Sequence, residues 1–127
     1  RASRALTGMY DRALATTGLT LPQFSLLRQI KRAGTVSVTQ LAHIVGLERT
    51  TMGRNLRPLE SMHLIATRPS ETDARERLVA LSAAGEAAIE RALPMWRKAQ
   101  QRIETQLGGE KLAVLRKMLM DIEQTAS

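Results

Sequence analysis

Hydroxyl and guanidinium side chains recur on one face of a predicted helix over residues 48–62. At about 100° per residue, Thr50, Arg54 and Arg57 share this side, which we call the arginine face. The opposite, apolar side consists of Met52, Leu56 and Leu59. An arginine can donate two parallel hydrogen bonds to a guanine edge, so the arginine face has the chemistry to read DNA from the major groove. The alternative is a solvated helix on which Arg57 pairs with Glu60, three residues further on.

Further polar side chains gather at the start of this helix and of the shorter helix predicted before it. Arg49 and Thr51 begin the longer helix, where free backbone N–H groups favour phosphates or base edges. Asn55 projects toward the flank of the arginine face. Ser37 and Thr39 begin the shorter helix and are predicted to contact phosphates. The alternatives for Ser37 are that it only caps the helix, or that it both caps the helix and contacts a phosphate.

A dense charged segment, ETDARER, leads directly into the alternating sequence LVAL. Its residues Arg75 and Arg77 could enter a narrow A·T-rich minor groove, whose strong negative potential attracts arginine. The alternative is an exposed cluster of ion pairs, each worth ~0–1 kcal/mol. Glu71 and Glu76 would repel phosphates, so we expect the chain to hold both side chains outward, away from DNA.

Two helices joined by a tight turn must position the polar side chains. A short helix is predicted over SVTQLAHIVG, where Ser37 and Gln40 form a capping-box pattern. Its inward face is predicted to consist of Leu41, Ala42 and Ile44. Gly46 then permits a sharp turn into the longer helix, so the pair reads as a helix-turn-helix. Pro58 cannot donate a backbone hydrogen bond, so we expect the longer helix to bend there.

The charged segment lies between two predicted strands, at residues 64–68 and 77–81. Pro69 closes the first strand, and alternating side chains mark the second, so the segment reads as a β-hairpin with a charged tip. Ser82 can cap the helix that follows the hairpin. We expect Pro94 to kink that helix.

Longer helices are predicted on both sides of this region. One covers residues 5–17, and a capping box between Thr20 and Gln23 starts a second. After the hairpin, one helix is predicted over residues 83–107 and another over residues 110–124, because two glycines lie between them. The flanking segments therefore add helical length without further strands.

The chain has 127 residues, a net charge of +7 and no cysteine. A positive chain favours a polyanionic partner such as nucleic acid. Residues 1–33 hold six basic and one acidic side chain, however, so overall charge does not locate a binding face. The lack of cysteine excludes disulfides and thiolate zinc sites, and it fits a reducing compartment such as the cytoplasm. No apolar run approaches the ~20 residues of a membrane span, so no membrane partner is expected.

The residue types do not form a catalytic or metal-binding pattern. The sequence lacks a Gly-rich phosphate loop and a His–carboxylate–nucleophile set, so we expect neither an enzyme nor a cofactor. His43 and His63 lie on different predicted helices without paired carboxylates, so no metal site is expected. The charged N-terminal segment does not resemble a signal peptide. Because the sequence does not start with Met, we expect residues to be missing before Arg1.

The order of these elements and two of their motifs resemble the MarR family of bacterial winged-helix regulators. The segment VTQLAHIVGLERTTMGRNLRPLESMHLI matches the helix-turn-helix of that family, with Leu-Ala-x-x-x-Gly-Leu followed by Arg-Thr-Thr. The hairpin matches the wing signature through Asp73, Arg75, Val79, Leu81, Ser82 and Gly85. The resemblance implies a mainly α fold with a small β-hairpin wing, in which Asp73 pairs with Arg75 to shape the wing tip.

The resemblance also implies a homodimer in which each chain forms one MarR-like domain over residues 1–127. In it, residues 19–82 form the winged helix-turn-helix that binds DNA, and residues 1–18 and 83–127 form dimerisation helices. Apolar positions on these helices would expose a large patch in a monomer, which usually marks an interface. They are Leu6, Met9, Leu115, Met118, Leu119 and Ile122. A symmetric dimer would match a pseudo-palindromic site on double-stranded DNA with half-sites ~34–36 Å apart, whereas the alternative is a compact monomer.

Many members of the family repress genes near their own and release DNA when they bind small aromatic acids. The resemblance therefore implies a repressor with a small aromatic effector. Tyr10, Phe24 and Trp96 are the only aromatic residues, and they either line the effector pocket or form plain core. The alternative function is a protein-interaction module without sequence-specific DNA binding. A docking face of that kind would carry aromatic or aliphatic anchors, which the arginine face lacks.

Overall fold

The computed structural model describes the backbone of residues 2–125 and the side chains of residues 4–105, 114 and 116–121. The chain is mainly helical with one small antiparallel sheet, which confirms the predicted fold class. The elements are α1 (Ala2–Ala13), the 3-10 helix η1 (Ala15–Thr17), α2 (Leu21–Ala33), β1 (Val36–Ser37), α3 (Val38–Val45), α4 (Arg49–Ser61), β2 (Ile65–Pro69), β3 (Arg77–Leu81) and α5 (Ala83–Thr125).

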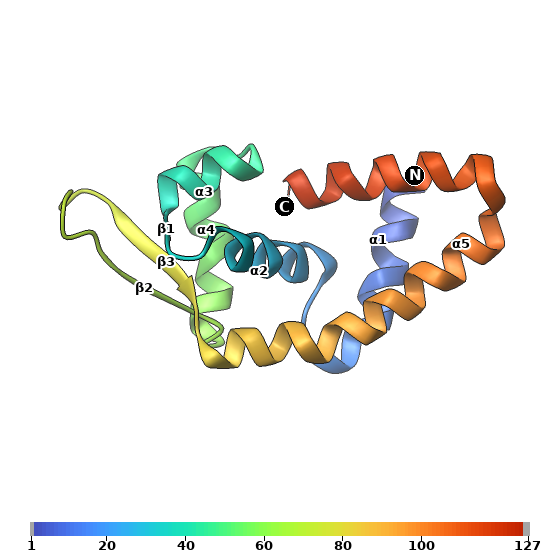
Figure 1. Ribbon diagram of the computed structural model, residues 1–127, viewed down its shortest axis with the longest axis horizontal. Helices are drawn as coiled ribbons and strands as arrows, with labels where there is room; N and C mark the ends of the chain where they lie inside the picture. The colour runs from blue at the N-terminus through green and yellow to red at the C-terminus, as the bar shows by residue number, and fades with distance from the viewer. Residues whose placement is uncertain (1, 126–127) are drawn as a thin grey trace.

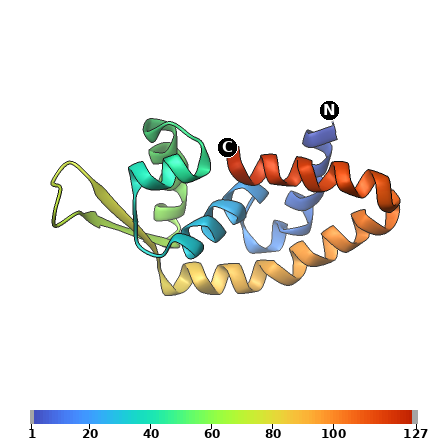
Figure 2. The same cartoon turned by 45° about the horizontal axis from the view of Figure 1, so that its top comes forward.

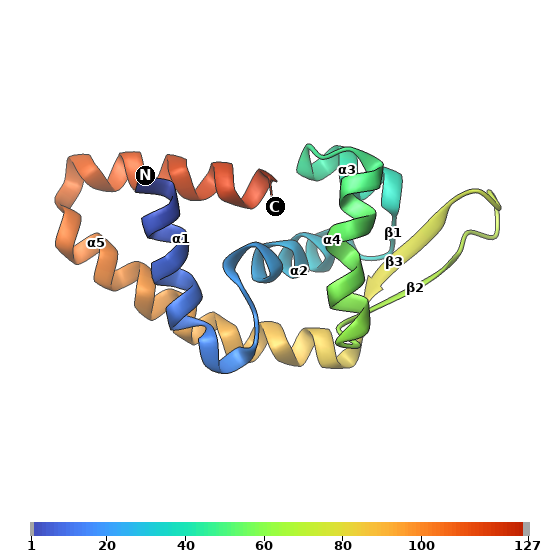
Figure 3. The same ribbon diagram turned by 180° about the vertical axis from the view of Figure 1, so that it is seen from behind.

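The elements divide the molecule into two ends, which α5 connects (Figure 1). At one end lie α3, α4 and the β2–β3 hairpin, whose tip projects away from the body (Figure 2). At the other end α1 lies against α5. Seen from behind, α2 occupies the space between the two ends (Figure 3). The long helix α5 therefore supports both ends of the molecule.

Helix α2 forms the centre of the core because most of its apolar side chains are buried. These are Leu21, Phe24, Leu26, Leu27 and Ile30. The predicted capping box is present: the Thr20 side chain accepts from Gln23 N, and the Gln23 side chain accepts from Thr20 N. Gly34 ends the helix with a positive φ of 74°. Local sequence signals thus fix both ends of the helix on which the other elements pack.

Helices α3 and α4 form the predicted helix-turn-helix, with Gly46 in the left-handed conformation at φ 84°. The apolar side of α4 is buried as predicted, through Met52, Leu56 and Leu59. The prediction for Ile44 is wrong, because its side chain is 53% exposed. The buried positions of α3 follow the spacing i, i+3, i+4, i+7, which turns Val45 inward and Ile44 outward.

Helix α4 continues without interruption through Pro58. It ends in a turn where His63 adopts a positive φ of 61°. A non-glycine residue in this region is uncommon, and it marks a turn that the surrounding contacts must hold in place. Those contacts come from the start of α5, described below.

The sheet has three strands in the order β1–β3–β2, one more than the sequence analysis predicted. Strand β1 pairs Val36 with Val79 of β3, and β2 pairs Ile65 with Leu81. The Val79 side chain is fully buried against the body. The hairpin is therefore attached along its base to the segment that leads into α3.

The start of α5 is fastened to the end of α4. Ser82 N donates to Leu64 O (3.1 Å), and Ser82 Oγ donates to His63 O (2.6 Å). The same hydroxyl accepts from Gly85 N (3.0 Å), so Ser82 caps α5 as predicted. A Cβ at Gly85 would collide with the Leu64 carbonyl oxygen, which explains the glycine at this position of the wing signature.

Helix α5 spans Ala83–Thr125, so the predicted division into two helices at the glycines is wrong. Figure 1 shows its ribbon turning back so that the C-terminal part passes above the N-terminal part. The bounds of one helix thus include both glycines, although the axis of α5 reverses direction along its course. Among the described helices, none is long and apolar enough to cross a membrane.

Candidate nucleic-acid interface

The arginine face of α4 is open to solvent. Thr50, Arg54 and Arg57 are all exposed, and the neighbouring Thr51 and Asn55 are half-buried. Glu60, the partner of Arg57 in the alternative interpretation, accepts a hydrogen bond from Thr67 Oγ1 on β2 (2.7 Å). The arginine face therefore presents two guanidinium groups and a hydroxyl, all of which suit the polar edges of bases and phosphates.

The two hydroxyl side chains at the start of α3 have different roles. Ser37 is buried, and its Oγ accepts from Gln40 N (3.0 Å), so its side chain caps the helix. Thr39 is exposed, but its hydroxyl lies against the base of the wing. Of the two predicted phosphate contacts, the structure thus turns Ser37 toward the protein and leaves Thr39 at the surface.

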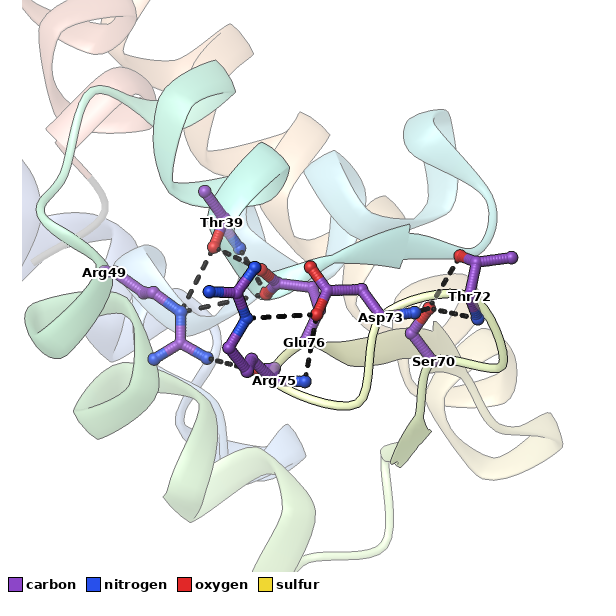
Figure 4. A network of polar contacts seen from close by, with 7 residues as sticks. All are labelled: Thr39, Arg49, Ser70, Thr72, Asp73, Arg75 and Glu76. Atoms are coloured by element: carbon purple, nitrogen blue, oxygen red, sulfur yellow. Dashed lines mark hydrogen bonds and ion pairs between the residues drawn. The ribbon is translucent and has the colours of Figure 1, made fainter.

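The prediction that Glu76 points outward is wrong. Its carboxylate accepts from Thr39 N (3.3 Å) and from Thr39 Oγ1 (2.8 Å) at the start of α3 (Figure 4). Arg49 Nε, at the start of α4, donates to Thr39 Oγ1 (3.1 Å) and lies 3.7 Å from Glu76 Oε1. The correction has a physical reason, because free N–H groups at a helix start and a nearby guanidinium attract a carboxylate.

This environment stabilises the charged form of Glu76. The hydrogen bond from the Thr39 hydroxyl lowers the pKa of the Glu76 carboxyl below its ordinary value of 4.5, and the positive charge of Arg49 acts in the same direction. Glu76 therefore carries its negative charge throughout the neutral pH range.

Hydrogen bonds within the wing tip fix its shape. Asp73 Oδ1 accepts from Arg75 N (3.0 Å) and from Arg75 Nε (3.4 Å). Ser70 Oγ accepts from the backbone N–H groups of Thr72 and Asp73, both at 3.3 Å (Figure 4). The Arg75 side chain is 93% exposed, so most of its guanidinium remains available to a partner.

Arg77 is less available than Arg75. Its Nη2 donates to Thr67 Oγ1 across the hairpin (2.9 Å), and that hydroxyl donates to Glu60. This connection ties the base of the wing to the end of α4. Neither the role of Thr67 nor its contact with Glu60 was predicted, because both depend on residues that hairpin pairing, and not helical spacing, brings together.

The three aromatic residues are brought together in the core. The ring centroid of Trp96 lies 6.1 Å from that of Tyr10 and 6.2 Å from that of Phe24. The Arg28 guanidinium lies over the rings of Phe24 and Trp96. Tyr10 and Phe24 are fully buried. Their predicted role in an effector pocket stays a prediction, and their packing also fits the plain-core interpretation.

A separate pocket of about 320 Å³ lies between α1 and α5. Its lining combines apolar and basic side chains, including Met9, Arg12, Met95, Lys98, Arg102 and Ile103. Within the described part of the chain, no group of three His, Asp or Glu residues is placed to hold a metal ion. The pocket thus suits an organic anion better than a cation.

The residues predicted for the dimer interface differ in exposure. Leu6, Met9 and Met118 are half-buried, whereas Leu119 is 9% exposed and so packs within the single chain. The side chains of Leu115 and Ile122 lie outside the described residues. Val114 and Met120, on the same part of α5, are 55% and 59% exposed. Apolar surface is therefore present there, with partly different members from those predicted.

The chain is similar to known regulators in sequence. A model of the MarR family matches residues 19–76, which contain α2, the helix-turn-helix, β2 and the tip of the hairpin. The HTH-type transcriptional repressor Rv2887 of Mycobacterium tuberculosis is 31% identical over 107 residues, which make up 84% of this chain and 77% of that protein.

The fold is also similar to structures solved with DNA. The M. tuberculosis transcriptional regulator MOSR in complex with DNA matches with a TM-score of 0.80 and 36% identity, over 99% of this chain and 90% of that one. The transcriptional repressor CouR, bound to a 23-mer DNA duplex, matches with a TM-score of 0.84 and 26% identity, over 96% of this chain and 87% of that one.

Proposed function

Since the chain belongs to the MarR family of DNA-binding transcription regulators, we propose that it is a homodimeric repressor of a pseudo-palindromic operator. The observation that carries this proposal is the exposed arginine face on α4, beside a wing whose Arg75 side chain is also exposed. MOSR and CouR, which share the fold, are bound to DNA in their structures. As such a regulator acts on bacterial chromosomal DNA, we place the protein in the cytoplasm.

In this proposal residues 19–82 read DNA. Each α4 enters a major groove, where Arg54 and Arg57 bond base edges and Thr50 supports them. Arg49 and Thr51 contact the DNA near the start of the helix, and Asn55 reaches its flank. Arg75 reaches the adjacent minor groove, whereas Arg77 contributes less because Thr67 already accepts one of its hydrogen bonds.

Residues 1–18 and 83–127 bring two copies together. The exposed side chains of Val114 and Met120 on α5 support this proposal, because burying them against a second chain removes apolar surface from water. Dimerisation then places two copies of α4 on the same side of the DNA, one helical turn apart. Each half-site adds phosphate and base contacts, so the dimer binds far more tightly than one chain.

A small aromatic acid is the effector that we propose. The pocket between α1 and α5 supports this class of ligand, because Arg12, Lys98 and Arg102 can attract a carboxylate while Met9 and Met95 contact a ring. A ligand there would favour one relative position of α1 and α5. Operator release then follows if that position changes the spacing of the two α4 helices.

The test is fluorescence anisotropy on the DNA upstream of the protein's own gene, with excess random competitor DNA and several salt concentrations. We expect binding that survives competitor, and Arg54→Ala should lose about 1–3 kcal/mol of discrimination between operator and random DNA. Gln101→Glu, an exposed change on α5, controls for surface charge away from the arginine face. Weak binding that competitor abolishes and Arg54→Ala does not affect would favour the interaction-module alternative.

A further inference from the structure

Glu76 connects three elements of the DNA-binding region from a position where a negative charge is unexpected. It lies immediately before β3, and its carboxylate contacts Thr39 on α3 and Arg49 on α4 (Figure 4). Only 21% of its side chain is exposed, although the residues around it are predicted to meet phosphates. The position therefore needs an explanation beyond a solvated surface charge.

The hydrogen bonds of Thr39 are fully determined by this contact. A threonine hydroxyl has one proton, and Thr39 donates it to Glu76 Oε2. Thr39 Oγ1 itself accepts a hydrogen bond from Arg49 Nε, and Thr39 N donates to Glu76 Oε1. Thr39 thus has no proton left for a phosphate, and its hydroxyl links the carboxylate to the guanidinium.

The link determines where the Arg49 guanidinium points. A guanidinium is planar, so holding its Nε–H toward Thr39 also sets the directions of the two Nη groups. Arg49 Nη2 makes only a long contact to the Arg75 carbonyl (3.5 Å), and 53% of the side chain is exposed. The Nη edge of Arg49 is therefore the part that can meet DNA.

We propose that Glu76 is a positioning residue for DNA binding, which acts through Thr39 to aim the Arg49 guanidinium at the phosphate backbone. This role rests on the proposed function. It predicts the opposite sign from simple charge repulsion, in which any carboxylate beside DNA weakens binding. Glu71 at the exposed wing tip provides the matched control, because it is acidic and lies in the same hairpin.

The experiment uses operator sequences that the wild-type protein enriches from a random DNA pool, and measures their binding by fluorescence anisotropy. Loss of an oriented hydrogen bond predicts about three- to tenfold weaker binding for Glu76→Ala and for Thr39→Val. Glu76→Gln should recover most of the affinity, since its amide oxygen still accepts from Thr39. Glu71→Ala should bind as well as wild type or more tightly.

Two further measurements separate aiming of Arg49 from general support of the fold. In an Arg49→Ala background, Glu76→Ala should cause no additional loss, because the group that it positions is gone. In the DNA-free protein, the NMR signal of Arg49 Nε–H should shift in Glu76→Ala and stay in place in Glu71→Ala. Thermal melting by circular dichroism identifies any variant that does not fold, in which case Glu76→Gln and Thr39→Val carry the test.

The outcomes are distinct. The positioning role is overturned if Glu76→Ala binds the enriched operator as tightly as wild type, or if its loss is equally large without Arg49. An Arg49 signal that ignores Glu76→Ala would overturn it as well. If the wild-type protein enriches no sequence, both the proposed function and the positioning role are wrong. If the wild-type protein binds an enriched operator and Glu76→Ala binds it equally well, only the role of Glu76 is wrong.

Discussion

The two ends of the molecule are held together by different interactions. Around α3, α4 and the hairpin, side-chain hydrogen bonds join distant parts of the chain, such as Thr39 to Glu76 and Thr67 to Glu60. Between α1 and α5 the contacts are chiefly apolar, and a pocket remains. Hydrogen bonds depend on direction, whereas apolar contacts depend mainly on area. The first end is therefore built to hold a geometry, and the second to permit adjustment.

Breaking the dimer surface should have the largest effect. The double variant Val114→Glu, Met120→Glu places two carboxylates where we propose burial, so it should shift the dimer toward monomer and reduce operator binding by a factor of about 100 or more. Sedimentation at several protein concentrations measures the assembly. Gln101→Glu adds a carboxylate at another exposed position of α5 and controls for added charge. A double variant that remains fully dimeric would contradict the proposed role of Val114 and Met120.

The second-largest effect is expected from substitution of Gly85, at the junction between the two ends, which should reduce the stability of the fold. In Gly85→Ala the new methyl group meets the Leu64 carbonyl oxygen, which cannot move independently of β2. The expected loss is about 1–3 kcal/mol in the free energy of unfolding, measured by urea denaturation. Gly53→Ala, on α4 with open space around its Cβ position, should be neutral or slightly stabilising. Equal stability of the two variants would rule out the close approach of residue 85 to the Leu64 carbonyl oxygen.

The wing should contribute a smaller and sequence-dependent effect. Arg75→Ala removes one cation from each of the two wing tips in the dimer, so operator binding should weaken about three- to tenfold and the salt dependence should fall by about two charges per dimer. The loss should be greatest on operators with A·T-rich flanks, where the minor groove is narrow. Anisotropy on matched A·T-rich and G·C-rich operators measures this difference, and an equal loss on both would exclude minor-groove reading.

The smallest effect concerns pH. Because the folded protein lowers the pKa of Glu76, the carboxylate stabilises the fold above its unfolded pKa, and this contribution disappears as pH falls through the lower folded value. The stability difference between wild type and Glu76→Gln should therefore be larger at pH 7 than in acid below 4.5. Urea denaturation at both pH values measures it. A difference that does not change with pH would mean that the contact is not charge-dependent.

Local signals in the sequence were sufficient for most of the fold. The capping box at Thr20, the glycine turn at Gly46 and the apolar stripe of α4 were all readable because neighbours within four residues determine them. The exposed arginine face follows from the same periodicity. These features require no knowledge of the rest of the chain.

The features that sequence reasoning missed depend on distant residues. Strand β1 has only two residues, too few for alternation, and it exists because β3 lies beside it. Glu76 turns inward because the starts of α3 and α4 offer N–H groups, although 37 residues separate it from Thr39. Ile44 was predicted to face inward because its side chain is apolar, but its position on α3 lies outside the buried stripe.

The attachment of Ser82 to His63 and Leu64 has a mechanical consequence. It makes the hairpin a closed loop whose two ends meet, so the first turn of α5 and the last turn of α4 move as one rigid corner. In the proposed repressor, we expect a rotation of the first part of α5 to carry α4 with it, with no bending of the helix-turn-helix required.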